Sequence, residues 1–244
     1  MSLTAHALTL LGQARGGTER EALEIALATL HGVSATHVHG ICSPEATSAF
    51  QRAYSLLGGI PEHPMRGRLL HGFGFVLSLR ADYAEALAVA ERAEELSSAS
   101  NDPVLVLVTC MVRGYVAQLQ GRPRAAGPWI ERGLASAELL DLAPAEIFVA
   151  DPQVTLLGLL GLHLLNSGLV EQGRARLEEA HARARLLGWP NTRLAALWYE
   201  ALFVVRLGDA VRVAALADEM RALVDESEVA QGRTACRWFR GWAD

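Results

Sequence analysis

The sequence predicts an all-α protein made of stacked helical hairpins, and three features lead to this prediction. Alanine and leucine dominate the 244 residues, β-branched residues are sparse, and no stretch alternates between apolar and polar residues with the period of a strand. Capping residues and glycines mark helix starts and ends along the whole chain. Small residues also recur about every forty positions, which indicates a repeated unit.

Five local patterns predict where helices begin. The segments 18–21 (Thr-Glu-Arg-Glu) and 82–85 (Asp-Tyr-Ala-Glu) have the spacing of a capping box, in which a side-chain oxygen accepts from the amide three residues on. Ser43, Asp102 and Asp151 each precede a proline, so each places a capping oxygen before a residue that suits the first helical position.

Glycines predict where helices end, because glycine readily adopts the left-handed conformation that stops a helix. The candidates are Gly58, Gly59, Gly121, Gly168, Gly188 and Gly208. Starts and ends together predict about eleven helices. They cover roughly 19–31, 44–57, 65–80, 83–99, 103–120, 123–139, 152–167, 170–187, 192–207, 210–224 and 228–242. The short connections predict that neighbouring helices are antiparallel.

Two series of small residues share one register. The first is Gly74, Gly114, Gly161, Ala201 and Gly241, with steps of 40, 47, 40 and 40. The second is Ala81, Gly121, Gly168 and Gly208, with steps of 40, 47 and 40. Each unit is then a helix, a glycine-type turn and a second helix, and such units must stack to bury their apolar faces. The longer step predicts an insertion of about seven residues around 141–151.

The units resemble tetratricopeptide repeats (TPR). Leu70, Phe73, Gly74 and Leu77 match the first helix of that pattern, 81–86 matches its turn, and Ala93 matches a small residue of its second helix. Later units match at Gly114, Gly121, Ala126, Gly133, Leu157, Leu160, Gly161, Leu164, Gly168, Gly173 and Ala180. Most units lack the usual terminal proline, and the period exceeds 34 residues, so we expect extended helices. The resemblance implies a right-handed α-α superhelix, a solenoid of about five hairpins plus a trailing helix.

Five segments also resemble the C-terminal repeat region of large bacterial signalling ATPases. They are 43–45, 53–57, 150–154, 187–190 and 240–243. In that family an ATPase module precedes the repeats, and a winged-helix DNA-binding domain or a nucleotide cyclase precedes the ATPase. No phosphate-binding loop, recognition helix or cyclase motif occurs in this chain, so the family's catalytic residues do not carry over.

We expect residues 1–17 to be an N-terminal extension or partial helix and residues 18–244 to be one repeat domain. Segment 237–244 reads as the first helix of a unit without its second helix, which predicts a truncated last repeat. We interpret the chain as a piece of a longer protein; the alternative is a natural end capped by an oligomer contact. Self-association could then occur through Trp238 and Trp242.

The candidate site is a groove lined by the first helix of each unit. Residues three or four apart share that face. The candidate residues are Arg68, His71, Phe75, Met111, Tyr115, Gln118, Asn166, Trp198 and Arg206. A mainly apolar stripe with a few polar groups suits an apolar or amphipathic protein segment, or another domain of the same polypeptide. Two alternatives stay open: Phe75, Met111 and Trp198 as core residues, and the charged or polar positions as solvated surface.

Composition and motifs exclude several other classes. Lys+Arg number 22 and Asp+Glu 27, a net charge of −5, which argues against direct nucleic-acid binding. No apolar run reaches the length of a membrane span, and the N-terminus lacks the features of a signal peptide. Three widely spaced cysteines favour a reducing cytoplasm.

Candidate chemistry is sparse. No nucleophile elbow or zinc-protease motif occurs, and the adjacent carboxylates at 94–95, 178–179 and 225–226 read as surface charge. The best metal-like group is His31, His37, His39 and Cys42, whose spacing fits a polar loop between helices better than a zinc site. We therefore expect no enzyme activity, cofactor or metal in this chain.

The leading hypothesis is a non-catalytic interaction and regulatory module of a cytoplasmic signalling protein, with a transcriptional regulator as the expected parent. A protein segment or a small inducer bound in the groove would change the arrangement of the solenoid. The alternatives are the same module attached to an adenylate or guanylate cyclase, and a free-standing adaptor or scaffold.

Overall fold

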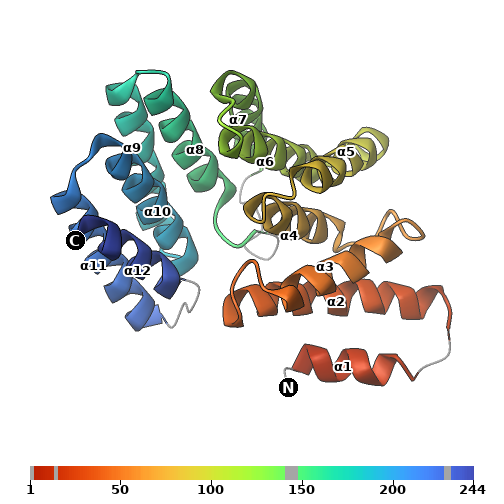
Figure 1. Ribbon diagram of the computed structural model, residues 1–244. Helices are drawn as coiled ribbons and strands as arrows, with labels where there is room; N and C mark the ends of the chain where they lie inside the picture. The colour runs from red at the N-terminus through yellow and green to blue at the C-terminus, as the bar shows by residue number, and fades with distance from the viewer. Residues whose placement is uncertain (1–2, 14–15, 141–147, 228–231) are drawn as a thin grey trace. The chain divides into compact units, whose positions relative to one another are not determined.

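The computed structural model describes residues 3–13, 16–140, 148–227 and 232–244, which contain twelve α-helices and no strand (Figure 1). The helices are α1 (Leu3–Leu11), α2 (Thr18–Val38), α3 (Pro44–Leu57), α4 (Arg66–Leu79), α5 (Tyr83–Ser100), α6 (Pro103–Leu119), α7 (Pro123–Glu138), α8 (Pro152–Asn166), α9 (Val170–Leu187), α10 (Pro190–Leu207), α11 (Ala210–Ser227) and α12 (Gly232–Ala243). The predicted all-α class is confirmed. None of these helices is both long and apolar enough to cross a bilayer.

The chain divides into two compact units, Met1–Val112 and Arg113–Asp244, and the division falls inside α6. Within each unit, helices that follow one another along the chain pack together, such as α2 with α3 and α8 with α9. In the second unit α10 also packs against α8, α9 and α12. This sequential packing is consistent with a superhelical repeat of hairpins.

Three of the five predicted helix starts are confirmed by their capping bonds. The side chains of Ser43, Asp102 and Asp151 accept from the backbone amides of Ala46, Val104 and Val154 at 3.2, 3.0 and 3.0 Å, respectively. Each of these residues precedes a proline, whose missing amide hydrogen needs no partner at the first position of a helix. A serine or aspartate directly before a proline therefore marked the helix start correctly in all three cases.

Neither predicted capping box forms its side-chain bond, although Asp82 is the N-cap of α5 as predicted. Thr18 is the first helical residue of α2, Gly17 is the N-cap, and the amide of Glu21 donates to the carbonyl of Gly17 at 3.0 Å. Asp82 stands at the N-cap of α5 but makes no capping bond, because its carboxylate pairs with the guanidinium Nε of Arg80 at 2.9 Å. In the second case a nearby charge competes with the backbone amide for the same oxygen.

The turn between the helices of a hairpin is built in the same way four times. In each, the backbone amide of the residue that follows the turn donates to a carbonyl five residues back. The donor–acceptor pairs are Asp82–Leu77, Arg122–Ala117, Leu169–Leu164 and Asp209–Val204. The residue between has a positive φ of 64, 68, 81 and 77° at Ala81, Gly121, Gly168 and Gly208, respectively. These are Schellman motifs, and they confirm the second small-residue series as a structural repeat.

The predicted left-handed stops at Gly58 and Gly59 fail, since neither has a positive φ, and a stop at Gly40 was missed. Gly58 ends α3 in the right-handed conformation, with φ of −57°, so its freedom to turn left-handed is not used. Gly40 follows α2 with φ of 98°, and it lies 41 residues before Ala81. The repeat register therefore extends one hairpin further toward the N-terminus than the sequence series indicated. The predicted insertion falls largely on 141–147, outside the described residues.

The first small-residue series marks close helix contacts at four of its five positions. A Cβ added at Gly74, Gly114 or Gly161 would lie 2.7, 3.1 and 3.0 Å from Val112, Ile130 and Leu177, respectively. Ala201 is fully buried in the core of the second unit. Gly241 differs: among the described residues, no atom outside its own helix backbone and chain neighbours lies within 4 Å of its added Cβ.

Candidate functional site

An aromatic surface on α10 and α12 contains the predicted groove residue Trp198. The ring of Trp198 lies 6.4 Å from that of Trp238 and 5.1 Å from that of Phe239. Phe239 is fully buried, whereas Trp238 and Trp242 expose 49% and 39% of their surface. Leu202 and Val205 continue the stripe along α10. We call Trp198, Leu202, Val205, Trp238 and Trp242 the aromatic face.

Helical periodicity positions these side chains. On α10, Trp198, Leu202 and Val205 are spaced i, i+4 and i+7, so they share one side of the helix. On α12, Ala235, Cys236 and Phe239 are buried against α10 and α11, and the two tryptophans border that buried stripe. In the forty-residue register, Trp238 is equivalent to Trp198 and Trp242 is equivalent to Leu202. The packed core thus holds exposed aromatic rings in fixed positions.

Arginines border the aromatic face. Arg206 is exposed at the end of α10, its guanidinium donates to the carbonyl of Leu202 at 2.8 Å, and desolvation lowers its pKa. Arg237 is exposed on α12 next to Trp238. Aromatic rings beside guanidinium groups are typical of the residues that dominate the energy of protein interfaces.

The predicted residues on α6 and α8 are less accessible. Tyr115 and Gln118 are half-buried on α6, and Asn166 is exposed at the end of α8. Both amide atoms of Gln118 are buried, and neither has a hydrogen-bond partner among the described residues. Burial, with a contribution from the negative charge of ionised Tyr115, raises the pKa of Tyr199 well above its usual value. Gly158 leaves room for the Tyr199 ring, which would clash with any side chain there.

In the first unit, two of the four predicted residues lie in the core, and Arg68 and Phe75 are half-buried. His71 and Met111 are each 7% exposed, and the ring of His71 stacks on Phe75 with centroids 6.1 Å apart. Burial lowers the pKa of His71 to about 4, so this imidazole is neutral at pH 7. Arg68 is half-buried and near enough to His37 to lower the pKa of that histidine, although burial is the larger cause.

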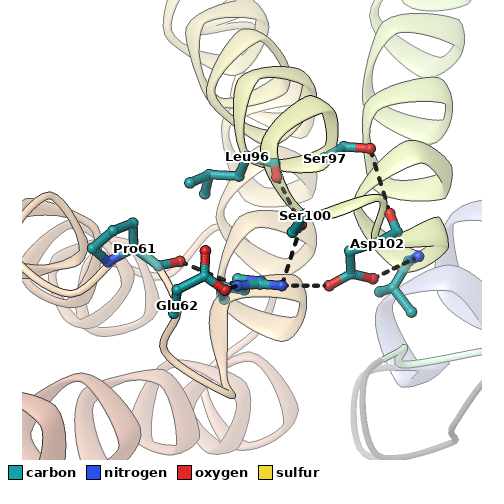
Figure 2. Close-up of polar contacts among 8 residues, drawn as sticks. Pro61, Glu62, Leu96, Ser97, Ser100 and Asp102 are labelled. Carbon is teal, nitrogen blue, oxygen red and sulfur yellow. Dashed lines mark hydrogen bonds and ion pairs between the residues drawn. The ribbon is translucent and has the colours of Figure 1, made fainter.

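Sequence reasoning missed a polar cluster around Arg66 (Figure 2). The guanidinium of Arg66, at the start of α4, contacts the carboxylates of Glu62 at 2.5 Å and Asp102 at 2.9 Å. It also lies 3.4 Å from the Ser100 hydroxyl. Asp102 at the same time caps α6 through the amide of Val104. The cluster ties the start of α4 to the α5–α6 connection, and its local signal was the acidic N-cap before proline.

A related pair lies in the second unit. Arg183 of α9 makes two parallel bonds to Asp151, from Nε at 2.7 Å and from Nη2 at 2.9 Å. The hydroxyl of Thr192 accepts from the backbone amide of Asp151 at 2.9 Å. Asp151 therefore links α8, α9 and α10. Because both carboxylate oxygens and the backbone amide of Asp151 have partners on these helices, we interpret this pair as support for the helices that carry the aromatic face.

The histidine-rich segment does not form the loop that was expected. His31 and His37 lie within α2, and His39 is its C-cap. The Nδ1 atom of His31 is 3.0 Å from the Thr4 hydroxyl, and Cys42 is exposed and unbridged. Among the described residues, no three His, Cys, Asp or Glu side chains are arranged to hold a metal ion. The apolar positions between the histidines continue the helical pattern, which explains the longer helix.

The structure thus brings together only some of the predicted residues. Trp198 and Arg206 lie on one accessible surface, while His71 and Met111 are buried in the first unit. Trp238 and Trp242 were expected only as a site of self-association, although the register makes Trp238 equivalent to the groove residue Trp198. Compared with protein-family models and with curated proteins, the chain matches none.

Proposed function

We propose that this chain is a non-catalytic protein-interaction and regulatory module whose TPR-like hairpins present the aromatic face to a protein segment. One observation carries the proposal: Trp238 and Trp242 are 49% and 39% exposed although their helix is anchored by the fully buried Phe239. Large aromatic side chains held rigidly at a surface lose little conformational entropy on binding, so they favour a binding role.

The repeated turns support the same proposal. Four Schellman motifs in one register fix the turn inside each of these hairpins, so each first helix is followed by its second helix in the same local geometry. The partner is a protein or peptide segment with apolar side chains, including a segment of another domain of the same polypeptide. Binding would favour one arrangement of the helices over another, as would a small inducer, and a coupled domain would respond to that change.

The parent protein is proposed from the resemblance described above. The module belongs in a cytoplasmic bacterial signalling protein, with a transcriptional regulator first, a nucleotide cyclase second and a free-standing adaptor third. All three cysteines are unbridged, which agrees with a reducing compartment. The gene sequence upstream of Met1 separates these parents, because a winged helix, a cyclase domain or neither would be encoded there.

Selection of peptides from a random displayed library tests the interaction role. We expect the purified chain to enrich a consensus peptide with apolar residues, and we expect Trp238→Ala to weaken its binding at least tenfold in an anisotropy titration. Because Trp238 is half exposed, its truncation should leave the fold intact, which circular dichroism checks.

Leu186→Ala is the matched control, since Leu186 is an 83% exposed apolar residue on the second helix of a hairpin. Its truncation should leave the affinity unchanged. Equal losses in the two variants, or no enriched peptide at all, would refute the proposed role of the aromatic face.

A further inference from the structure

A short stretch of the second unit is basic in an otherwise acidic chain. Segment 122–132 carries three arginines and one glutamate, a net charge of 3 − 1 = +2, whereas the whole chain carries −5. Arg122 is the N-cap of α7, and Arg124 and Arg132 lie on that helix. All three side chains are exposed, and none forms an ion pair with another described residue. Their charge therefore faces solvent without a nearby carboxylate that binds it.

These arginines do not serve the stability of α7. Cations at the start of a helix oppose the helix dipole, and the first turn of α7 holds no acidic residue. The equivalent helix of the next hairpin, α9, has Glu171 in its first turn, 47 residues after Arg124. The register thus places an arginine where the dipole favours a glutamate. A local departure of this kind is expected where a surface serves binding.

Trp129 holds part of this charge in place. Its ring is half-buried on α7, and the guanidinium of Arg132 lies 5.7 Å from the ring centroid. The guanidinium of Arg113, from α6, lies 4.9 Å from the same centroid. Stacking on an aromatic ring leaves the N–H groups at the edge of a guanidinium able to donate, and it restricts the side chain. A carboxylate that meets Arg132 would therefore find an ordered donor.

Helical spacing sets the exposed arginines in a row. Arg124, Pro128 and Arg132 are four residues apart, so they follow one side of α7, and all three are exposed. The helical rise separates the Cα atoms of Arg124 and Arg132 by about 12 Å. Two carboxylates four residues apart on an extended segment are separated by about 13 Å, so one such segment can meet both arginines. We call Arg122, Arg124, Trp129 and Arg132 the α7 basic strip.

We propose that the α7 basic strip binds an acidic, extended segment of a partner protein, with carboxylates at Arg124 and Arg132. Charge complementarity selects this partner, because a cation at either position would be repelled. The chain's net charge of −5 opposes a long polyanion such as nucleic acid, whereas a short segment meets mainly the charges within about 10 Å of it. The strip lies on other helices than the aromatic face, so it is a second binding site beyond the proposed function.

Anisotropy titrations with two labelled octapeptides test the charge requirement. One octapeptide alternates glutamate and serine, which places carboxylates four residues apart, and the other alternates glutamine and serine. We expect the full chain to bind the acidic octapeptide at least tenfold more tightly at low salt, and we expect added salt to reduce that difference. Equal binding of the two octapeptides, or no binding of the acidic one, would overturn the inference.

Two variants with the same change of charge locate the site. Arg132→Gln removes the cation beside Trp129, so we expect at least fivefold weaker binding of the acidic octapeptide. Arg185→Gln is the matched control, because Arg185 is exposed on α9 and forms no ion pair with another described residue. Its truncation should leave the affinity within twofold of the wild type. Both side chains are exposed, so both variants should fold, which circular dichroism checks. Equal losses would show an unspecific attraction to arginine and overturn the inference.

Indole N–H NMR signals distinguish this site from the aromatic face. The acidic octapeptide should shift the signal of Trp129 and leave those of Trp198 and Trp238 in place; the reverse pattern would overturn the inference. Tighter binding of a twelve-nucleotide oligothymidylate that Arg132→Gln abolishes would also overturn it, since the strip would then bind nucleic acid. If apolar library-selected peptides still require Trp238 while the acidic octapeptide fails, the proposed function stands and only this second site is excluded.

Discussion

The two units use the same device, an aspartate N-cap clamped by an arginine, in different surroundings. The Asp102 side chain is 26% exposed, and its partner Arg66 has a second carboxylate in Glu62. The Asp151 side chain is fully buried and is paired in two bonds with Arg183. One sequence signal, aspartate before proline, thus gives a partly exposed cap in one unit and a fully buried one in the other.

The two units also differ in how they use the first helix of a hairpin. In the first unit, the ionisable side chain of His71 is buried on α4. In the second unit, the tryptophans of α12 are exposed. A buried neutral histidine makes stability depend on pH, while exposed aromatic rings add little to stability and offer surface for binding. The comparison suggests that the first unit is specialised for packing and the second for contact.

Replacing the capping aspartates should give the largest difference between the units. Asp151→Ala removes a cap and leaves a partly buried guanidinium without its partner, so we expect it to lower the free energy of unfolding by about 3 kcal/mol. Asp102→Ala should lower it by about 1 kcal/mol, because Arg66 keeps Glu62. Urea unfolding measures both, and equal losses would contradict the difference in burial.

Acid should affect the first unit through His71. The folded-state pKa of about 4 lies below the unfolded value of 6.5, so the unfolded chain binds more protons between these values. The stability contributed by neutral His71 is complete above pH 6.5 and is lost as the pH falls toward 4. Between pH 7.5 and 5, we expect the wild type to lose about 2 kcal/mol more than His71→Leu in urea unfolding. Parallel pH profiles would show that His71 is not buried as described.

The smallest effects concern the turns. Ala81 adopts φ of 64°, a conformation that glycine adopts at the equivalent Gly208 with φ of 77°. Ala81→Gly should therefore raise the free energy of unfolding by about 0.5 to 1 kcal/mol, and Gly208→Ala should lower it by about 1 kcal/mol. Differential scanning calorimetry of the pair provides the test, and shifts of the same sign would contradict the shared Schellman geometry.

Much of the fold could be predicted from local signals. Helices α3 and α9 have the predicted bounds, because proline after Ser43 and glycine at 188 leave little freedom for their ends. The prediction for α2 stopped too early because histidines were read as a loop, although apolar residues continue the helical pattern to Val38. The capping boxes failed because sequence spacing alone does not show which partner an oxygen will choose.

The candidate site was harder to predict, because burial depends on neighbours far along the chain. On the first helix of each hairpin, apolar residues recur with the same helical spacing whether they are buried or exposed. This spacing does not distinguish the core residue Met111 from the partly exposed Trp198. Gly241 has the sequence signature of a packed position, yet among the described residues no atom outside its own helix backbone and chain neighbours lies within 4 Å of a Cβ added there. Aspartate before proline indicates the capping residue of each clamp, but Arg66 and Arg183 lie more than thirty positions from Asp102 and Asp151, so no local motif indicates the arginine partner.

The most direct test of the central claim is an indole N–H NMR spectrum of the chain titrated with a library-selected peptide. Single Trp→Phe variants assign the five tryptophan signals. If the aromatic face is the interaction surface, the signals of Trp198, Trp238 and Trp242 shift in a saturable manner while those of Trp129 and Trp189 stay in place. Shifts confined to Trp129 and Trp189, or the absence of any shift at saturating peptide, would contradict the account.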